Sequence, residues 1–178
     1  DVDFETRDDV SIPEYLKMIE YKTAVLVGAA MKMGAIVAET SEENKNLIYD
    51  FGLNLGIAFQ LQDDYLDAFG NPETFGKQVG GDIIENKKTY LYLKALEFGN
   101  SEEKEQLLHL FSIQPNDNTD KISSVKDIFN QTGASQATQK AIQDYTFSAF
   151  ETLEKMNISN DKKMILKAFG EKLMNRNV

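Results

Sequence analysis

The sequence predicts an all-α fold, and three observations support this prediction. Apolar residues recur at steps of three and four over most of the 178 residues, which is the period of amphipathic helices. The chain contains only 3 prolines, so long helices can form. No segment shows the alternation of apolar and polar residues that is typical of a half-buried strand. We therefore expect a single all-α domain, residues 1–178, built as a bundle of about six to eight helices.

The first expected helix spans residues 12–38. Ser11 precedes it as a candidate N-cap, and Glu14 follows three residues later, which is the spacing of a capping box. Two glycines, Gly28 and Gly34, lie inside this helix, and each costs it about 1 kcal/mol relative to alanine. Close crossing with another helix is the expected reason for tolerating this cost.

The second expected helix begins after Thr40 or Ser41, either of which can cap it, and continues to Phe69. Gly70 ends it. Residues 70–81 form a glycine-rich segment with one proline, and these residues favour turns over helix, so we expect a loop.

After this loop the apolar period predicts helices to the end of the chain. A polar turn is expected at 114–120. Residues 116–120 begin like a calcium loop, but Lys121 follows where such a loop needs a glycine, so we expect a solvated turn. The first of these expected helices covers 82–98 and ends at Gly99, and a short helix capped by Ser101 follows it. A third helix is expected from about Thr119 to an interruption near Gly133. The last two are expected at 135–156 and 160–175.

The composition excludes several classes of function. The chain has no cysteine, which excludes disulfides, cysteine zinc sites and thiol nucleophiles. His109 is the single histidine, so two histidines of one chain cannot share a metal, and we expect it to be a packing or surface residue. The net charge of −10 disfavours nucleic acid and anionic lipid as partners. No stretch is apolar enough for a membrane span and no signal peptide is evident, so we expect a cytoplasmic protein.

The strongest chemical signal is a group of three carboxylates, Asp63, Asp64 and Asp67, in an otherwise apolar helical stretch. At positions i, i+1 and i+4 they share one side of a helix. Like charges about 5 Å apart repel by roughly 3 kcal/mol at an effective dielectric constant of about 20. Hard carboxylate oxygens suit Mg²⁺, which binds one or two carboxylates and leaves positions for water and phosphate oxygens. A solvated acidic helix face is the alternative interpretation.

A basic, glycine-rich segment follows this acidic stretch. Glycines let the backbone approach a ligand closely, and lysines supply positive charge for phosphate. An acidic metal-binding helix followed by such a segment is suited to holding a diphosphate through Mg²⁺. The segment reads Gly76-Lys77-Gln78-Val79-Gly80-Gly81-Asp82, then Lys87-Lys88-Thr89.

The motifs, in this order and spacing, resemble those of the trans-isoprenyl diphosphate synthases, also called polyprenyl synthetases. The resemblance covers residues 1 to 93, and the helices beyond it carry no motif. It implies the C-terminal part of the isoprenoid synthase fold, an all-α bundle around a deep cavity that usually forms a homodimer. The matching residues are Asp1-Val2-Asp3, Glu20-x-Lys22-Thr23, Phe59-Gln60-x-Gln62-Asp63-Asp64-x-x-Asp67, Gly76-Lys77-x-x-Gly80-x-Asp82 and Lys87-x-Thr89-Tyr90.

The resemblance implies a prenyltransferase that joins an allylic diphosphate to isopentenyl diphosphate and makes a trans-polyprenyl diphosphate. Mg²⁺ held by two aspartate-rich motifs assists loss of the allylic diphosphate, which is followed by condensation and elimination. On this sequence, Asp63 is expected to ligate Mg²⁺ directly, Asp67 directly or through water, and Asp64 is the third candidate metal ligand.

The resemblance also assigns substrate-binding residues. The expected diphosphate-binding residues are Lys22, Lys77 and Lys87. Thr23 and Gln60 are expected to direct oxygen dipoles towards the allylic cation, and together with Lys22 they are the candidate catalytic residues. Phe59 is expected to shape the isopentenyl pocket.

The family's first aspartate-rich motif does not occur in these residues. We therefore expect the C-terminal portion of a synthase, inactive alone, with exposed apolar helix faces that promote self-association. The resemblance also implies that product length is set largely by residues near that first motif. The alternatives are a non-catalytic prenyl-synthase-like subunit, a helical interaction protein without a ligand, and another ionising terpenoid enzyme such as a terpene cyclase.

Overall fold

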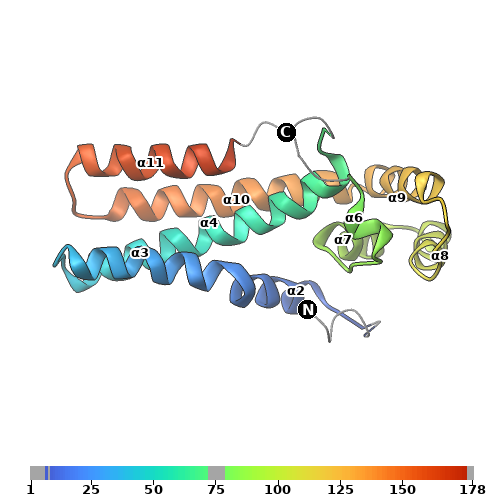
Figure 1. Cartoon of the computed structure of the whole chain (residues 1–178), viewed down its shortest axis with the longest axis horizontal. Helices are drawn as coiled ribbons and strands as arrows, with labels where there is room; N and C mark the ends of the chain where they lie inside the picture. The colour runs from blue at the N-terminus through green and yellow to red at the C-terminus, as the bar shows by residue number, and fades with distance from the viewer. Residues whose placement is uncertain (1–6, 8, 72–78, 176–178) are drawn as a thin grey trace. The chain divides into compact units, whose positions relative to one another are not determined.

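A computed structural model describes residues 7, 9–71 and 79–175 of the chain. All regular secondary structure in these residues is helical, which confirms the predicted fold class (Figure 1). The expectations for Asp1-Val2-Asp3, Gly76 and Lys77 fall outside the described residues. No helix in this part of the chain combines the length and apolar character needed to cross a membrane.

The helices pack as two compact units. One holds the described residues of Asp1–Tyr15 and Asp63–Lys140, and the other holds those of Leu16–Gln62 and Ala141–Asn177. The single domain expected from the sequence stays a prediction. In chain order the elements are α2 (Ile12–Ile19), the π-helical turn η1 (Glu20–Ala24), α3 (Val25–Val37), α4 (Glu42–Phe69), α6 (Gly81–Ile84), α7 (Tyr90–Phe98), α8 (Ser101–Leu110), α9 (Thr119–Gln131), α10 (Ala134–Lys155) and α11 (Asn160–Met174).

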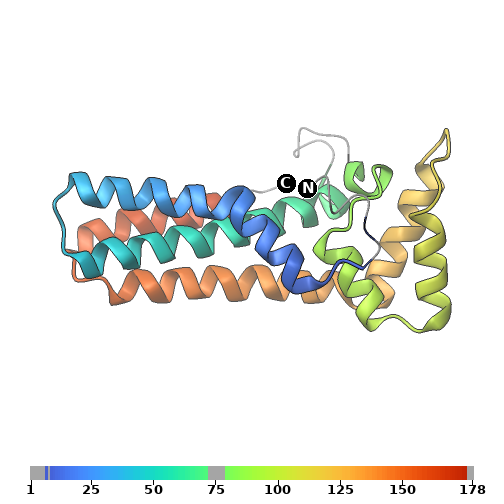
Figure 2. The same ribbon diagram turned by 90° about the horizontal axis from the view of Figure 1, so that it is seen from below.

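The unit containing Leu16–Gln62 is built from α3, α11 and the adjoining parts of α4 and α10, which run alongside one another (Figures 1 and 2). Its core joins α4 to α10, and side chains of α3 and α11 cover that core. Burial of these apolar side chains is the main stabilising contribution to such packing. The buried members of the core are Ile48, Phe51, Leu55, Ala149, Leu153 and Met156.

Glycines allow α4 to approach η1 and α3 very closely. A Cβ atom added to Gly52 would lie 2.9 Å from the Cα atom of Gly28, and one added to Gly56 would lie 2.6 Å from the Cα atom of Ala24. Close helix crossing therefore explains Gly28, as predicted. It does not explain Gly34, which is exposed and has no atom within 4 Å of its would-be Cβ position.

The unit containing Asp63–Lys140 places α7, α8 and α9 against one another and α6 against α9 (Figure 1). Val125 and Phe129 of α9 are buried here. The same face of α9 also carries Lys121, which is 3% exposed.

The single helix expected over 82–98 is wrong, because α6 and α7 are separate helices. Asn86 adopts φ 55, in the left-handed region, which interrupts the helical hydrogen bonds. Asparagine tolerates this conformation better than most residues. Thr89 then leads into α7 with extended backbone angles.

The helix caps agree in part with the sequence. The Ser11 hydroxyl accepts the Glu14 N–H, and the Glu14 carboxylate accepts the Ser11 N–H at 3.0 Å, which confirms the capping box. Ser41 accepts a backbone N–H three residues on, so it caps α4. The cap expected at Ser101 is wrong by one residue, because Asn100 forms the capping box of α8.

Candidate functional site

The three carboxylates of the predicted metal motif lie in the last turns of α4, and all are half-buried. Asp64 accepts a hydrogen bond from the hydroxyl of Tyr15. Tyr15 is 1% exposed, and its ring centroid lies 6.0 Å from that of Tyr90. Burial and the charge of Asp64 raise the pKa of Tyr15, so the phenol keeps its proton and acts as the donor. Asp64 is thereby held against a buried aromatic cluster.

Asp67 joins the end of α4 to the start of α6. Its Oδ2 accepts the N–H of Asp82 at 2.9 Å, and its carbonyl accepts the N–H of Gly80 at 2.6 Å. A Cβ atom on Gly81 would lie 3.1 Å from Oδ1, so the glycine leaves room for this carboxylate. Burial raises the pKa of Asp67 to about 6.

The raised pKa of Asp67 predicts a specific pH dependence of stability. Because the folded-state pKa of about 6 exceeds the ordinary value of 3.8, Asp67 favours folding below pH 3.8, and this contribution is lost as the pH rises to about 6. Asp67→Asn keeps an acceptor for the Asp82 amide without the charge. We expect it to raise the thermal midpoint at pH 7.5 by about 2–4 °C, which corresponds to about 1 kcal/mol in a chain of this size, and to change it little at pH 3.5. Circular dichroism measures both midpoints, and equal changes at the two pH values would contradict the prediction.

Lys87 belongs to the same polar network as Asp67. Its ammonium lies 2.9 Å from a carboxylate oxygen of Asp82 and 2.7 Å from one of Glu85. The hydrogen bonds from Lys87 to Glu85 and Asp82 raise the pKa of Lys87, so this exposed side chain stays charged at neutral pH. The acidic motif and the lysine segment are therefore linked through Asp82.

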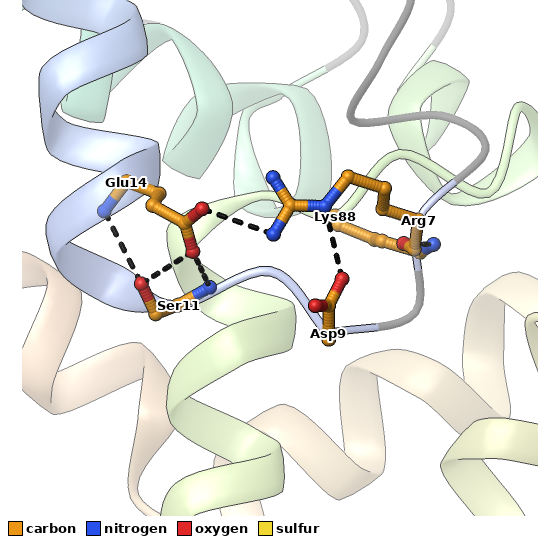
Figure 3. Close-up of polar contacts among 5 residues, drawn as sticks. All are labelled: Arg7, Asp9, Ser11, Glu14 and Lys88. Carbon is orange, nitrogen blue, oxygen red and sulfur yellow. Dashed lines mark hydrogen bonds and ion pairs between the residues drawn. The ribbon is translucent and has the colours of Figure 1, made fainter.

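Lys88 takes part in a different network. It donates to the backbone carbonyl of Arg7, whose guanidinium pairs with Asp9 at 2.9 Å and with Glu14 at 3.0 Å (Figure 3). Glu14 also belongs to the capping box of α2. Lys88 thus helps to hold the segment before α2 in place.

The predicted lysine–threonine motif lies in the π-helical turn η1, a type of distortion that is frequent at functional sites. Lys22 is exposed, while Thr23, Phe59 and Gln60 are half-buried. The Thr23 hydroxyl donates to the side-chain oxygen of Gln60 at 3.1 Å. Because its proton is engaged in this bond, the Thr23 oxygen has lone pairs for an electron-deficient group.

Among the described residues, no three acidic or histidine side chains converge on one point as a ready-made metal site. Asp64 is directed to Tyr15, and Asp67 to the amide of Asp82. Mg²⁺ commonly binds one or two carboxylates and completes its shell with water and phosphate oxygens. The hard oxygens of Asp63 and Asp67 fit an ion that is shared with a diphosphate.

Two residues in this region were not assigned a role from the sequence. Tyr15 contacts Asp64 across 49 positions of the chain, and no local pattern signals such a contact. Lys121 did carry a signal, because it shares a helical face with Val125 and Phe129. A lysine at an apolar position of an amphipathic helix indicates a specific buried partner.

Comparison of the sequence with known proteins identifies its relatives. The polyprenyl synthetase family model matches residues 1–131. A short chain isoprenyl diphosphate synthase of Methanothermobacter thermautotrophicus is 36% identical over 165 residues, covering 93% of this chain and 50% of that protein.

Solved structures show the same relationship. The crystal structure of a geranylgeranyl pyrophosphate synthase superposes with a TM-score of 0.92 at 52% identity, covering 100% of this chain and 55% of that one. A geranylgeranyl pyrophosphate synthase from Corynebacterium glutamicum, complexed with isoprenyl diphosphate and magnesium, superposes with a TM-score of 0.89 at 26% identity and covers 99% and 50%.

The chain spans about half the length of each of these relatives. The family model nevertheless matches more than half of the chain, including the acidic motif and the lysine segment. The chain therefore belongs to the polyprenyl synthetase family.

Proposed function

We propose that this chain forms part of a prenyltransferase that condenses an allylic diphosphate with isopentenyl diphosphate, head to tail, into a trans-polyprenyl diphosphate. The observation that carries the proposal is the network in which Asp67 of the acidic motif accepts from the Asp82 amide while the Asp82 carboxylate pairs with Lys87. This network joins the acidic motif, which suits a cation, to the lysine segment, which suits a diphosphate.

Mg²⁺ is the proposed metal, and Asp63 and Asp67 are the residues that would hold it. When bound, it neutralises the charge that develops on a diphosphate leaving group. Asp64 contributes to the acidic face, while its bond to Tyr15 keeps that carboxylate in place. The metal in the magnesium complex from Corynebacterium glutamicum supports this choice for the chain.

The remaining residues position the substrates in this proposal. Lys22, Lys77 and Lys87 bind the diphosphate, and Lys87 can exchange its pairing with Asp82 and Glu85 for phosphate oxygens. Thr23 and Gln60 direct oxygen lone pairs towards the allylic cation, which the bond between them supports. Phe59 shapes the isopentenyl pocket.

A cytoplasmic homodimer is the proposed state, by analogy with the family. Nucleic acid is not a proposed partner, because the net charge of −10 repels it. A non-catalytic subunit of the same family is the second candidate, and the clustered acids argue against it. A subunit that binds no metal would have no cation to offset the repulsion among the three carboxylates.

The experiment that tests the proposal is thermal unfolding of the 178-residue chain with Mg²⁺ alone, inorganic diphosphate alone, and both together. A ligand that binds only the folded state raises stability by mass action. We expect a rise that requires both ligands. No rise with the pair would count against a diphosphate site. Mixing the chain with the N-terminal half of the Methanothermobacter relative and assaying transfer of labelled isopentenyl diphosphate then separates a catalytic chain from a non-catalytic one.

A further inference from the structure

Among the described residues, Lys121 is the only charged residue that is buried, with 3% of its surface exposed. Its ammonium donates to the side-chain oxygen of Asn86 at 2.5 Å and to the carbonyl oxygen of Ile113 at 3.0 Å. Both of these acceptors are neutral. Burying an ammonium against neutral acceptors costs stability, and an apolar side chain of similar length would fill the space at lower cost. The presence of a lysine here points to a role beyond packing.

Asn86, the partner of Lys121, lies in the turn between α6 and α7 and has the left-handed backbone conformation of that turn. Asn86 adopts φ 55, and directly after it the N–H of Lys87 donates to the carbonyl of Asp82 at 2.9 Å. This turn brings the Lys87 ammonium to 2.9 Å from the Asp82 carboxylate. The conformation of Asn86 therefore sets where Lys87 lies relative to Asp82.

The neighbour of Lys121 on α9 supports the other end of the same segment. Gly80, at φ 87, packs so closely on Ile122 that an added Cβ atom would lie 2.9 Å from the Ile122 Cδ1 atom. Gly80 also donates its N–H to the carbonyl of Asp67. Two consecutive residues of α9 thus contact both ends of the segment 80–86.

We propose that Lys121 is a positioning residue for diphosphate binding, because it fixes the Asn86 turn and thereby presents Lys87 beside Asp82. This inference rests on the proposed function, in which Lys87 contacts the diphosphate. Lys121 itself touches neither metal nor substrate. Its effect passes through Asn86 to the segment that contains Asp82 and Lys87.

The positioning effect can be measured without any ligand. Lys121→Met removes the ammonium and keeps a side chain of similar length. We expect trypsin to cut after Lys87 or Lys88 about tenfold faster in this variant than in the parent chain, which is the size expected for loss of a hydrogen bond to a charged group. Lys162→Met, at an exposed position of α11, is the control and should leave this rate unchanged. An unchanged rate in Lys121→Met overturns the proposal.

If Lys121→Met folds poorly, a matched pair of variants at Asn86 tests the same proposal. Asn86→Gly and Asn86→Asp both tolerate a positive φ, but only aspartate keeps an acceptor for Lys121. We expect Asn86→Gly to be cut about tenfold faster and Asn86→Asp to match the parent chain. Circular dichroism verifies that each variant is folded. A parent-like rate in Asn86→Gly overturns the proposal.

The link to diphosphate is tested by calorimetric titration with Mg²⁺ and inorganic diphosphate. We expect Asn86→Gly and Lys121→Met to bind the pair about tenfold more weakly, the size typical for loss of a supporting contact, and Asn86→Asp to bind as the parent does. Faster cleavage with unchanged affinity would reduce Lys121 to a structural residue and overturn the proposal. A parent chain that binds no Mg²⁺–diphosphate overturns the proposed function, and this inference with it.

Discussion

Replacing Asp63 with asparagine is expected to abolish the stabilisation that Mg²⁺ and diphosphate together give the chain. The substitution keeps the shape of the side chain but removes its negative charge, and a neutral amide oxygen is a weaker ligand than a carboxylate for a hard divalent cation. Loss of a carboxylate ligand should weaken binding by at least about 100-fold, since even residues that only support a ligand contribute 10- to 100-fold. At ligand concentrations near saturation, this loss lowers the ligand-dependent stability by about 2.7 kcal/mol. It is detected as a smaller difference between the thermal midpoints with and without Mg²⁺ and diphosphate.

Asp50→Asn is the matched control for this experiment. Asp50 lies on the same helix, α4, is exposed, and loses the same charge. Its ligand-dependent stabilisation should equal that of the parent chain, because a single distant surface charge is largely screened. If Asp63→Asn kept the full ligand-dependent rise, Asp63 would not be a ligand of the metal. If both variants lost the rise, net charge and not a specific ligand would be responsible.

The helices could be predicted well because their causes are local. The apolar period of three and four residues and the capping residues placed most boundaries within a residue or two, as for α4 and α11. Two local distortions were not predictable in this way. The π-helical turn η1 leaves the apolar pattern unbroken, and the break at Asn86 lies inside a stretch whose period continues on both sides.

The candidate site could be predicted only where its residues share one helix. Spacing alone places Asp63, Asp64 and Asp67 on one side of α4, and their roles stay a prediction. The partners of these acids come from other elements, as with Tyr15 on Asp64 and the Asp82 amide on Asp67. Such contacts depend on how helices pack, and no pattern of neighbouring residues in a single sequence predicts that packing.

Gly56→Ala is expected to destabilise the chain by about 2–3 kcal/mol, because the added methyl group has no space. It would lie 2.6 Å from the Cα atom of Ala24 and 2.9 Å from its Cβ atom, so backbone must move to relieve the clash. Ala24 directly follows Thr23, so the same displacement should also weaken the bond from Thr23 to Gln60. Urea unfolding followed by circular dichroism measures the free energy of unfolding.

Gly34→Ala is the same chemical change, but we expect it to raise the stability of the chain. Gly34 lies in α3, is exposed, and has no atom within 4 Å of the position of an added Cβ. Alanine there lowers the conformational freedom of the unfolded chain and should stabilise the protein by up to about 1 kcal/mol. Opposite signs for the two variants would show that close approach of η1 to α4, and not helix propensity, requires glycine at position 56. A destabilising Gly34→Ala or a neutral Gly56→Ala would contradict this account of the crossing.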